Sequence, residues 1–142
     1  MTLKKLRSAA LALAILSPMI PAQAAWAQDC GLAPEPILAL NYGSRYTADS
    51  ENRADLDEEG SAAVDEALDP VDTFLRDLTR IANDVPLEDA RDARLSADCV
   101  LSQIATWAEA GAMGDLQSVN AQLTVGSRIA GFGLVLLQVL PY

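Results

Sequence analysis

The stretch Leu95-Ser-Ala-Asp-Cys-Val-Leu-Ser-Gln-Ile-Ala-Thr-Trp-Ala-Glu-Ala-Gly111 decides which fold this chain can adopt. Its apolar residues recur at three- and four-residue steps, the period of one helical face. Gly111 follows the last apolar turn, where a helix commonly ends in a left-handed residue. The sequence therefore predicts a central core helix. We expect its inward face to be formed by Ala97, Leu101, Ile104, Ala105 and Ala108, with Val100 and Trp107 beside them.

The first 27 residues have the composition of a secretory signal peptide. Basic residues at positions 4, 5 and 7 precede a short apolar run over 9–16, and small residues around Trp26 fit a cleavage site. The run is too short for a bilayer core of about 30 Å, so a membrane anchor is the weaker interpretation. We expect a cleaved signal peptide over 1–27 and a mature domain over 28–142, periplasmic or secreted, with no membrane anchor.

Export changes the interpretation of the two cysteines, Cys30 and Cys99. In an oxidising compartment they can form a disulfide, and their even number favours one. The bond would close a loop of about 69 residues, for which chain entropy gives roughly 4 kcal/mol of stability. Two separate thiols, one of them buried beneath the central helix, are the alternative. We expect the disulfide.

The mature chain is strongly acidic, with seven basic residues, all arginine, against twenty acidic ones and thus a net charge of −13. A field of that sign argues against nucleic acid and anionic membrane surfaces as partners. There is no histidine, the commonest acid–base residue and metal ligand. The acidic stretch over 49–69 lacks the residue pattern of a calcium loop, so a solvated helix or loop is expected there. No metal or organic cofactor is expected.

Two further helices are expected, one before and one after the central helix in the sequence. The first begins at Asp69-Pro70, where an aspartate can cap free amides and a proline suits the first helical position, and it ends at Val85-Pro86. On its outward face, Arg76 and Arg80 are expected to form weak surface pairs with Asp72 and Asp77.

The last helix is expected from about 119 to 140, and its glycines suggest close contact with a neighbouring backbone. Its second half is apolar on nearly every side, which favours burial on several sides over a short membrane span. Two other helices cannot surround it, so we expect the chain to be the front of a longer protein. The apolar patch over 37–40 is either a short strand or an arm packed on helices, and periodicity does not choose between them.

Two segments carry a resemblance to a known family. Ser44-Arg45-Tyr46 is similar to a Ser-Lys-Tyr segment near the front of the alginate lyases that cleave polymannuronate. The run Cys99-Val-Leu-Ser-Gln-Ile-Ala-Thr-Trp-Ala-Glu-Ala-Gly-Ala-Met113 is similar to the family's helix, in which cysteine, Trp-Ala and Gly-Ala keep the same spacing. The resemblance covers roughly residues 30–142. It implies an all-α fold in which these helices are the front of an incomplete α/α toroid, and an anionic polysaccharide such as alginate as partner.

The family's reaction is β-elimination, in which the C5 proton of a uronate is removed and the 4-O-glycosidic bond breaks. It needs a cation or amide on the carboxylate and positioned groups that move protons. The resemblance implies that Arg45, at the family's lysine position, binds a sugar carboxylate. Tyr46 is the second substrate-binding candidate, with packing favoured over proton transfer. A surface arginine paired with a nearby acid is the alternative for Arg45. The family's Asn-His pair is absent, so no catalytic residue is assigned.

The leading hypothesis is therefore the N-terminal part of an exported polysaccharide lyase, inactive by itself. The main alternative is a non-catalytic periplasmic helical module that binds polysaccharide, or a partner protein through its last apolar helix. A small structural helical protein is the third possibility.

Overall fold

The computed structural model describes residues 31 and 33–142, so the predicted signal peptide and Cys30 lie outside the described residues. Most of the described part is helical: α1 (Glu58–Asp84), α2 (Ala90–Glu109) and α3 (Val119–Val139), with a short 3-10 turn, η3 (Val85–Leu87), between the first two. Two short strands, β1 (Ala39–Leu40) and β2 (Asp115–Leu116), pair in parallel. The all-α prediction is confirmed.

Helix α1 begins earlier than predicted. Asp57 is its N-cap, and the Asp57 carboxylate accepts hydrogen bonds from the backbone N–H groups of Glu59 and Gly60 at 3.0 and 3.1 Å. Pro70 lies inside the helix, although an interior proline removes one helical hydrogen bond. Apolar burial on one face continues across the proline and offsets this loss; the residues concerned are Val64, Leu68 and Val71. The second half of the predicted solvated acidic stretch is therefore the first part of a core helix.

Helix α2 ends at Glu109, and Gly111 follows it in the left-handed conformation, as predicted. Gly111 has φ 71°, its N–H donates to the Ala108 carbonyl at 3.0 Å, and the N–H of Ala112 donates to the Trp107 carbonyl at 3.0 Å. These two bonds form a Schellman motif.

The predicted inward face of α2 is partly wrong, because Ala105 and Ala108 are exposed and Leu101 is only half-buried. The residues that are buried are Ala93, Ala97, Val100, Gln103, Ile104 and Trp107. The face is rotated because the larger side chains of Val100 and Trp107 remove more apolar surface from water than two alanines would.

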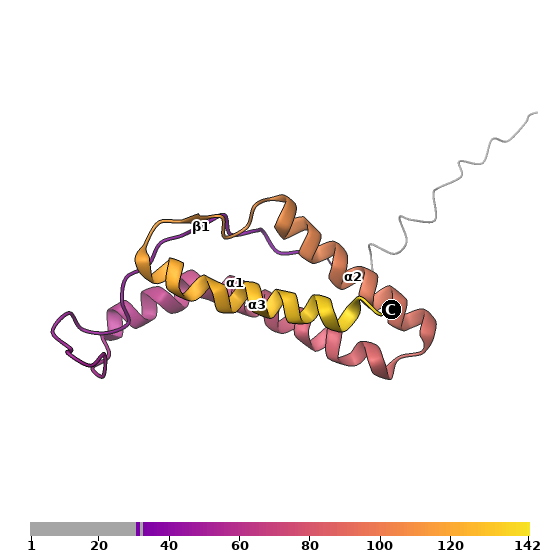
Figure 1. The fold of residues 1–142 in the computed structure, drawn as a ribbon, viewed down its shortest axis with the longest axis horizontal. Coiled ribbons are helices and arrows are strands. Elements are labelled where there is room, and N and C mark those ends of the chain that lie inside the picture. The colour runs from indigo at the N-terminus through magenta and orange to yellow at the C-terminus, as the bar shows by residue number, and fades with distance from the viewer. Residues whose placement is uncertain (1–30, 32) are drawn as a thin grey trace, which may run out of the picture.

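Helices α1 and α3 lie side by side and run in the same direction, whereas α2 returns antiparallel to α1 (Figure 1). The difference in residue number between contacting residues of α1 and α3 is almost the same at two places along the helices. Arg128 Nε lies 2.9 Å from Asp72 Oδ1, and Gln138 Nε2 lies 2.8 Å from Asn83 Oδ1. Parallel neighbours need a long crossover, which α2 and the extended segments around it supply.

Gly131 allows this close approach of α3 to α1. A Cβ atom built on Gly131 would lie 2.5 Å from Cδ2 of Leu75. The predicted contact with a neighbouring backbone is not found, because the neighbour of Gly131 is the Leu75 side chain. Gly126 and Gly133 have no such neighbour within 4 Å of an added Cβ.

One aromatic ring from each helix meets at the centre of the core. The ring centroid of Phe74 on α1 lies 4.6 Å from that of Trp107 on α2 and 5.8 Å from that of Phe132 on α3. The centroids of Trp107 and Phe132 are 5.9 Å apart. All three separations fall in the range in which tilted aromatic pairs attract one another. The three rings therefore hold the bundle together.

The extended segment 34–42, which we call the arm, precedes α1 and runs beside the segment that joins α2 to α3 (Figure 1). Backbone N–H groups of Met113, Asp115 and Gln117 donate to carbonyls of the arm at 2.6, 3.1 and 2.9 Å. The indole N–H of Trp107 donates to the Pro34 carbonyl at 2.9 Å. The stretch over 37–40 is thus both an arm and, over its last two residues, a short strand.

Ser118 fixes the end of the arm to the start of α3. Its hydroxyl accepts from the N–H of Ala121 at 3.2 Å as the N-cap of α3, and it donates to the Tyr42 carbonyl at 2.9 Å. The Tyr42 ring is buried, and its hydroxyl is hydrogen-bonded to the Thr124 hydroxyl. Capping of α3 and docking of the arm therefore depend on the same side chain.

Helix α3 is buried on one side only. Leu123, Leu134 and Leu137 are 67, 68 and 70% exposed, so the described part of the chain does not provide the expected burial on several sides. Among the described helices, α3 alone is long and apolar enough to cross a membrane by length and composition. Soluble core helices pass the same test, and the inner side of α3 packs on α1 and α2.

Candidate functional site

The Arg45 side chain, from the loop before α1, packs on the first turns of α1. Its Nη1 donates to the Ser61 hydroxyl at 3.2 Å, and its Nη2 lies 2.7 Å from the Asp65 carboxylate. The Arg45 side chain is 35% exposed and that of Asp65 is 67% exposed. The arrangement expected for an ordinary surface arginine is therefore present, and the guanidinium is still open to solvent. Its role in binding a sugar carboxylate stays a prediction.

A closed loop places Arg45 there. The Asp57 N–H donates to the Arg45 carbonyl at 2.8 Å, the Thr47 N–H donates to the Asp55 carbonyl at 3.0 Å, and Tyr46 forms an isolated antiparallel bridge with Leu56. Tyr46 is half-buried, and its backbone N–H donates to the Ser44 hydroxyl at 3.0 Å. Its role in substrate binding stays a prediction.

Gly60 is the point at which this loop rests on α1. A Cβ atom at position 60 would lie 2.5 Å from the backbone carbonyl oxygen of Ser44. A backbone atom cannot move aside as a flexible side chain can, so a larger residue would lift the loop. Gly60 thereby sets the height of Arg45 above the helix.

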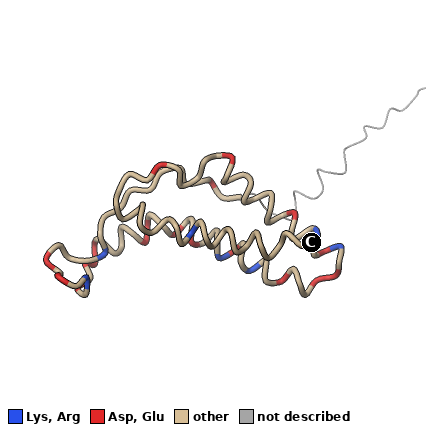
Figure 2. Tube along the Cα trace, viewed as in Figure 1, with Lys and Arg blue, Asp and Glu red and all other residues tan. Residues whose placement is uncertain are grey.

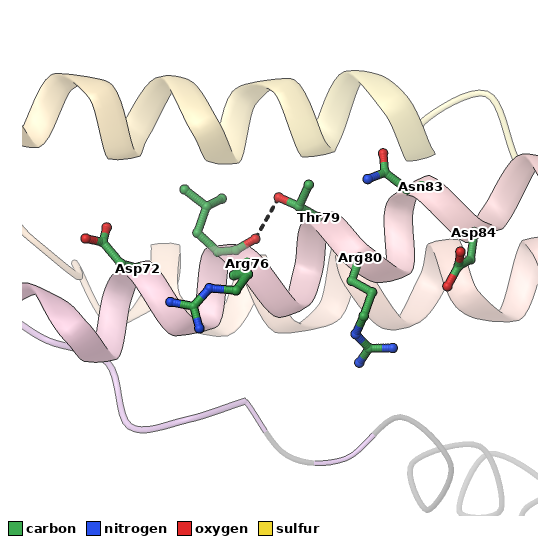
Figure 3. Close-up of a pocket in the computed structure, with 7 residues that line it drawn as sticks. Asp72, Arg76, Thr79, Arg80, Asn83 and Asp84 are labelled. Carbon is green, nitrogen blue, oxygen red and sulfur yellow. Dashed lines mark hydrogen bonds between the residues drawn. The ribbon is translucent and has the colours of Figure 1, made fainter.

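A second cationic feature lies further along α1. An open hollow of about 670 Å³ is lined by seven residues: Asp72, Leu75, Arg76, Thr79, Arg80, Asn83 and Asp84. In Figure 3, Arg76 and Arg80 extend to the side of α1 away from α3, whereas Thr79 and Asn83 point toward α3. Neither arginine has a carboxylate within 4.0 Å in the described part of the chain. The expected surface pairs with Asp72 and Asp77 are therefore not formed.

Asp72 pairs instead with Arg128 of α3. Two parallel bonds join them, from Nε to Oδ1 at 2.9 Å and from Nη2 to Oδ2 at 2.8 Å. The hydrogen bonds to Asp72 raise the pKa of Arg128 above its ordinary value. Bidentate pairs of this kind are stronger than single ones, which explains why Asp72 is not shared with its helix neighbours. The pairing was missed from the sequence because the partner is distant along the chain.

Acidic residues outnumber arginines along the described chain, and the arginines are spaced among them (Figure 2). Among residues 31 and 33–142, no group of three His, Cys, Asp or Glu side chains is placed to hold a metal ion. Cys99 is half-buried on α2, and Gln103 Nε2 lies 3.5 Å from its Sγ. Because Cys30 lies outside the described residues, the predicted disulfide stays a prediction.

Comparison with characterised proteins finds a relative of the kind that the two sequence segments suggest. The chain is 32% identical over 85 residues to an alginate lyase of Pseudomonas putida (strain W619). The match covers 59% of this chain and 22% of that protein, so the chain spans about a fifth of the length of this relative. No protein-family model matches the chain. No solved structure matches it either.

Proposed function

We propose that this chain is the N-terminal helical portion of an exported polysaccharide lyase of the alginate lyase kind, and that it contacts an anionic polyuronate. The observation that carries this proposal is the similarity over 85 residues to an alginate lyase. The Ser44-Arg45-Tyr46 segment and the Cys99 helix support it. In this proposal α1, α2 and α3 are the front helices of an α/α toroid, and the protein acts in the periplasm or outside the cell.

Arg45 is the residue proposed to bind the sugar carboxylate. Its guanidinium carries five N–H donors, more than its contacts with Ser61 and Asp65 use. An ion pair as exposed as Arg45–Asp65 contributes only about 0–1 kcal/mol, so a uronate carboxylate can compete with Asp65 for it. Tyr46, next in the chain, is proposed to contact the sugar ring.

Arg76 and Arg80 are proposed as a second contact. They are four residues apart on one helix, which places them about 6 Å apart along its axis. Both are exposed, and the described part of the chain shows no ion pair for either. A polyuronate has a carboxylate on every sugar, so one strand can meet both guanidinium groups. This matters because the acidic chain otherwise repels such a polymer.

The chain is proposed to bind without turning over its ligand. β-Elimination needs a group that takes the C5 proton and one that protonates the leaving oxygen. The family assigns these roles to an Asn-His pair and a later tyrosine, and this sequence contains no histidine. The alternative of a non-catalytic binding module predicts the same binding, and the presence of lyase motifs in any further coding sequence would separate the two.

The test is calorimetric titration of the protein with short polymannuronate chains. Arg45→Gln is expected to weaken binding about tenfold, the loss of a charge-assisted contact. The control is Arg94→Gln, which makes the same charge change at an exposed position on α2. The double variant R76Q/R80Q tests the second contact. Equal losses in all variants would mean that only net charge matters and would contradict the assigned site.

Two further measurements complete the test. A neutral oligosaccharide of the same length is expected not to bind. Absorbance of unsaturated uronate is expected to stay flat when the protein is incubated with polymannuronate. Product formation by this chain would refute the inactive-portion proposal, and lack of any uronate binding would refute the polysaccharide partner.

A further inference from the structure

Among residues 31 and 33–142, nothing covers the outward side of α3, which is an uncharged apolar face. Six large apolar side chains on it are between 56 and 70% exposed: Val119, Leu123, Ile129, Leu134, Leu137 and Leu140. The single charged residue of α3, Arg128, lies on the opposite side against Asp72. Apolar faces of this extent on soluble proteins mark interaction sites. We call these six residues, with Gly126, Ala130 and Gly133 between them, the outer face.

The spacing along the outer face is symmetric about Ala130. Gly126 and Leu134 lie four residues to either side of it, and Leu123 and Leu137 lie seven residues to either side. Steps of three and four residues keep all five on one line along the helix. If a second α3 crosses antiparallel with Ala130 on Ala130, each Leu123 meets a Leu137 and each Gly126 receives a Leu134. The face is thus complementary to itself, which is the condition for a two-fold interface.

The size of the outer face also suits a second copy. A stable interface buries about 800 Å² on each partner. Six large apolar side chains that are more than half exposed offer roughly 100 Å² each, an area of that order. An added Cβ on Gly126 or Gly133 would meet nothing within 4 Å, so there is room for an incoming side chain.

We propose that this chain forms a two-fold dimer through antiparallel packing of the outer face of α3 against that of a second copy. The dimer goes beyond the proposed function and does not rest on it. A membrane is disfavoured as the occupant because α3 would have to leave α1 and break the Arg128–Asp72 pair to enter it.

The first experiment is molar mass by light scattering and sedimentation over a range of protein concentrations. The wild type is expected to be a dimer, and its association should strengthen with added salt because both copies carry net negative charge. The variant L134E/L137E should be at least tenfold weaker in association. The control L87E/L56E adds the same charge at two leucines that are 84 and 62% exposed elsewhere, and should remain a dimer.

The second experiment fixes the geometry and does not depend on a disruptive variant. Ala130→Cys should give a disulfide-linked dimer on mild oxidation, whereas Ala105→Cys, exposed on α2, should not. A monomeric wild type, a dimer that survives L134E/L137E, or equal cross-linking by both cysteines would each overturn the proposal. So would a monomer that binds neutral phosphatidylcholine vesicles through the same leucines. None of these outcomes changes the uronate titration, so the two proposals fail separately.

Discussion

Trp107 connects the core to the arm at the scale of a single residue. Its ring packs against Phe74 and Phe132, and its N–H donates to the Pro34 carbonyl. Trp107→Phe keeps an aromatic ring between the phenylalanines but removes the donor. We expect a loss of about 1–3 kcal/mol in the free energy of unfolding, from the missing hydrogen bond and the smaller ring.

The loss of stability caused by Trp107→Phe should be concentrated in the arm. Amide exchange should quicken in the arm and in the N–H of Met113, which donates to the arm. Urea unfolding gives the stability, and hydrogen exchange gives the location. Phe132→Leu is the matched control: it should lower stability as well but leave the arm protected. Equal exchange in the two variants would show that the indole N–H does not hold the arm.

Gly60 tests whether the height of Arg45 above α1 matters. Gly60→Ala adds a methyl group where the Ser44 carbonyl lies, so the loop that carries Arg45 must shift. We expect uronate affinity to fall several-fold while the melting temperature changes by only a few degrees, since alanine also favours the helix. Gly126→Ala, on an open stretch of α3, should leave affinity unchanged.

Asp89 gives α2 a pH dependence. Backbone hydrogen bonds from Asp92 and Arg91 lower the pKa of Asp89 below its ordinary value of 3.8. A lowered pKa in the folded state stabilises the fold above the ordinary value, and this contribution disappears as pH falls through the folded-state pKa. Asp89→Asn should therefore lower the melting temperature at neutral pH and have a smaller effect near about pH 3.

At the scale of the helices, apolar periodicity predicted α2 and α3 well and α1 only in part. The ends of α2 and α3 follow from local chemistry: a serine or aspartate before each helix and Gly111 after α2. Asp69-Pro70 looks like a helix start because capping chemistry is local, whereas the burial of Val64 and Leu68 that continues the helix through the proline is tertiary. The rotation of α2 has the same origin, since its partners are distant in sequence.

Pro70 provides the prediction at this scale. Pro70→Ala restores an N–H that can bond to the Glu66 carbonyl and removes the ring clash in mid-helix. We expect a gain of about 1–2 kcal/mol in stability, because the more flexible unfolded chain cancels part of the benefit. Pro86→Ala is the control, since Pro86 lies at the start of η3, where no helical N–H is needed. Urea unfolding of both variants checks this, and a gain at Pro86 alone would contradict it.

At the scale of the whole molecule, the sequence could place the candidate residues in the chain but not in space. Arg45 and Tyr46 were singled out by resemblance, and their half-buried position in the loop before α1 depends on backbone bonds with no sequence signature. The outer face of α3 was visible as excess apolar content. Which side would be covered depends on the parallel packing of α1 and α3, which distant pairs such as Arg128–Asp72 set.

The disulfide is the last prediction, and the arm makes it geometrically feasible. Pro34 is anchored at Trp107, and Cys99 lies eight residues before Trp107, about 12 Å along α2. Four residues separate Pro34 from Cys30, and an extended chain of that length reaches about 14 Å. Cys30 can therefore reach Cys99. The bond would tie the start of the mature chain to α2 and fix the arm at both ends.

The measurement is intact mass with and without reductant, followed by thermal melting in both states. The oxidised protein should be two hydrogens lighter, and reduction should cost up to about 4 kcal/mol, a fall of more than 10 °C in melting temperature. The Cys99→Ser variant should have a melting temperature close to that of the reduced wild type, and reductant should not change it. If the purified protein titrates with two free thiols, the arm depends on Trp107, Ser118 and its backbone hydrogen bonds with the segment that joins α2 to α3, and substitution of Trp107 or Ser118 should then loosen it.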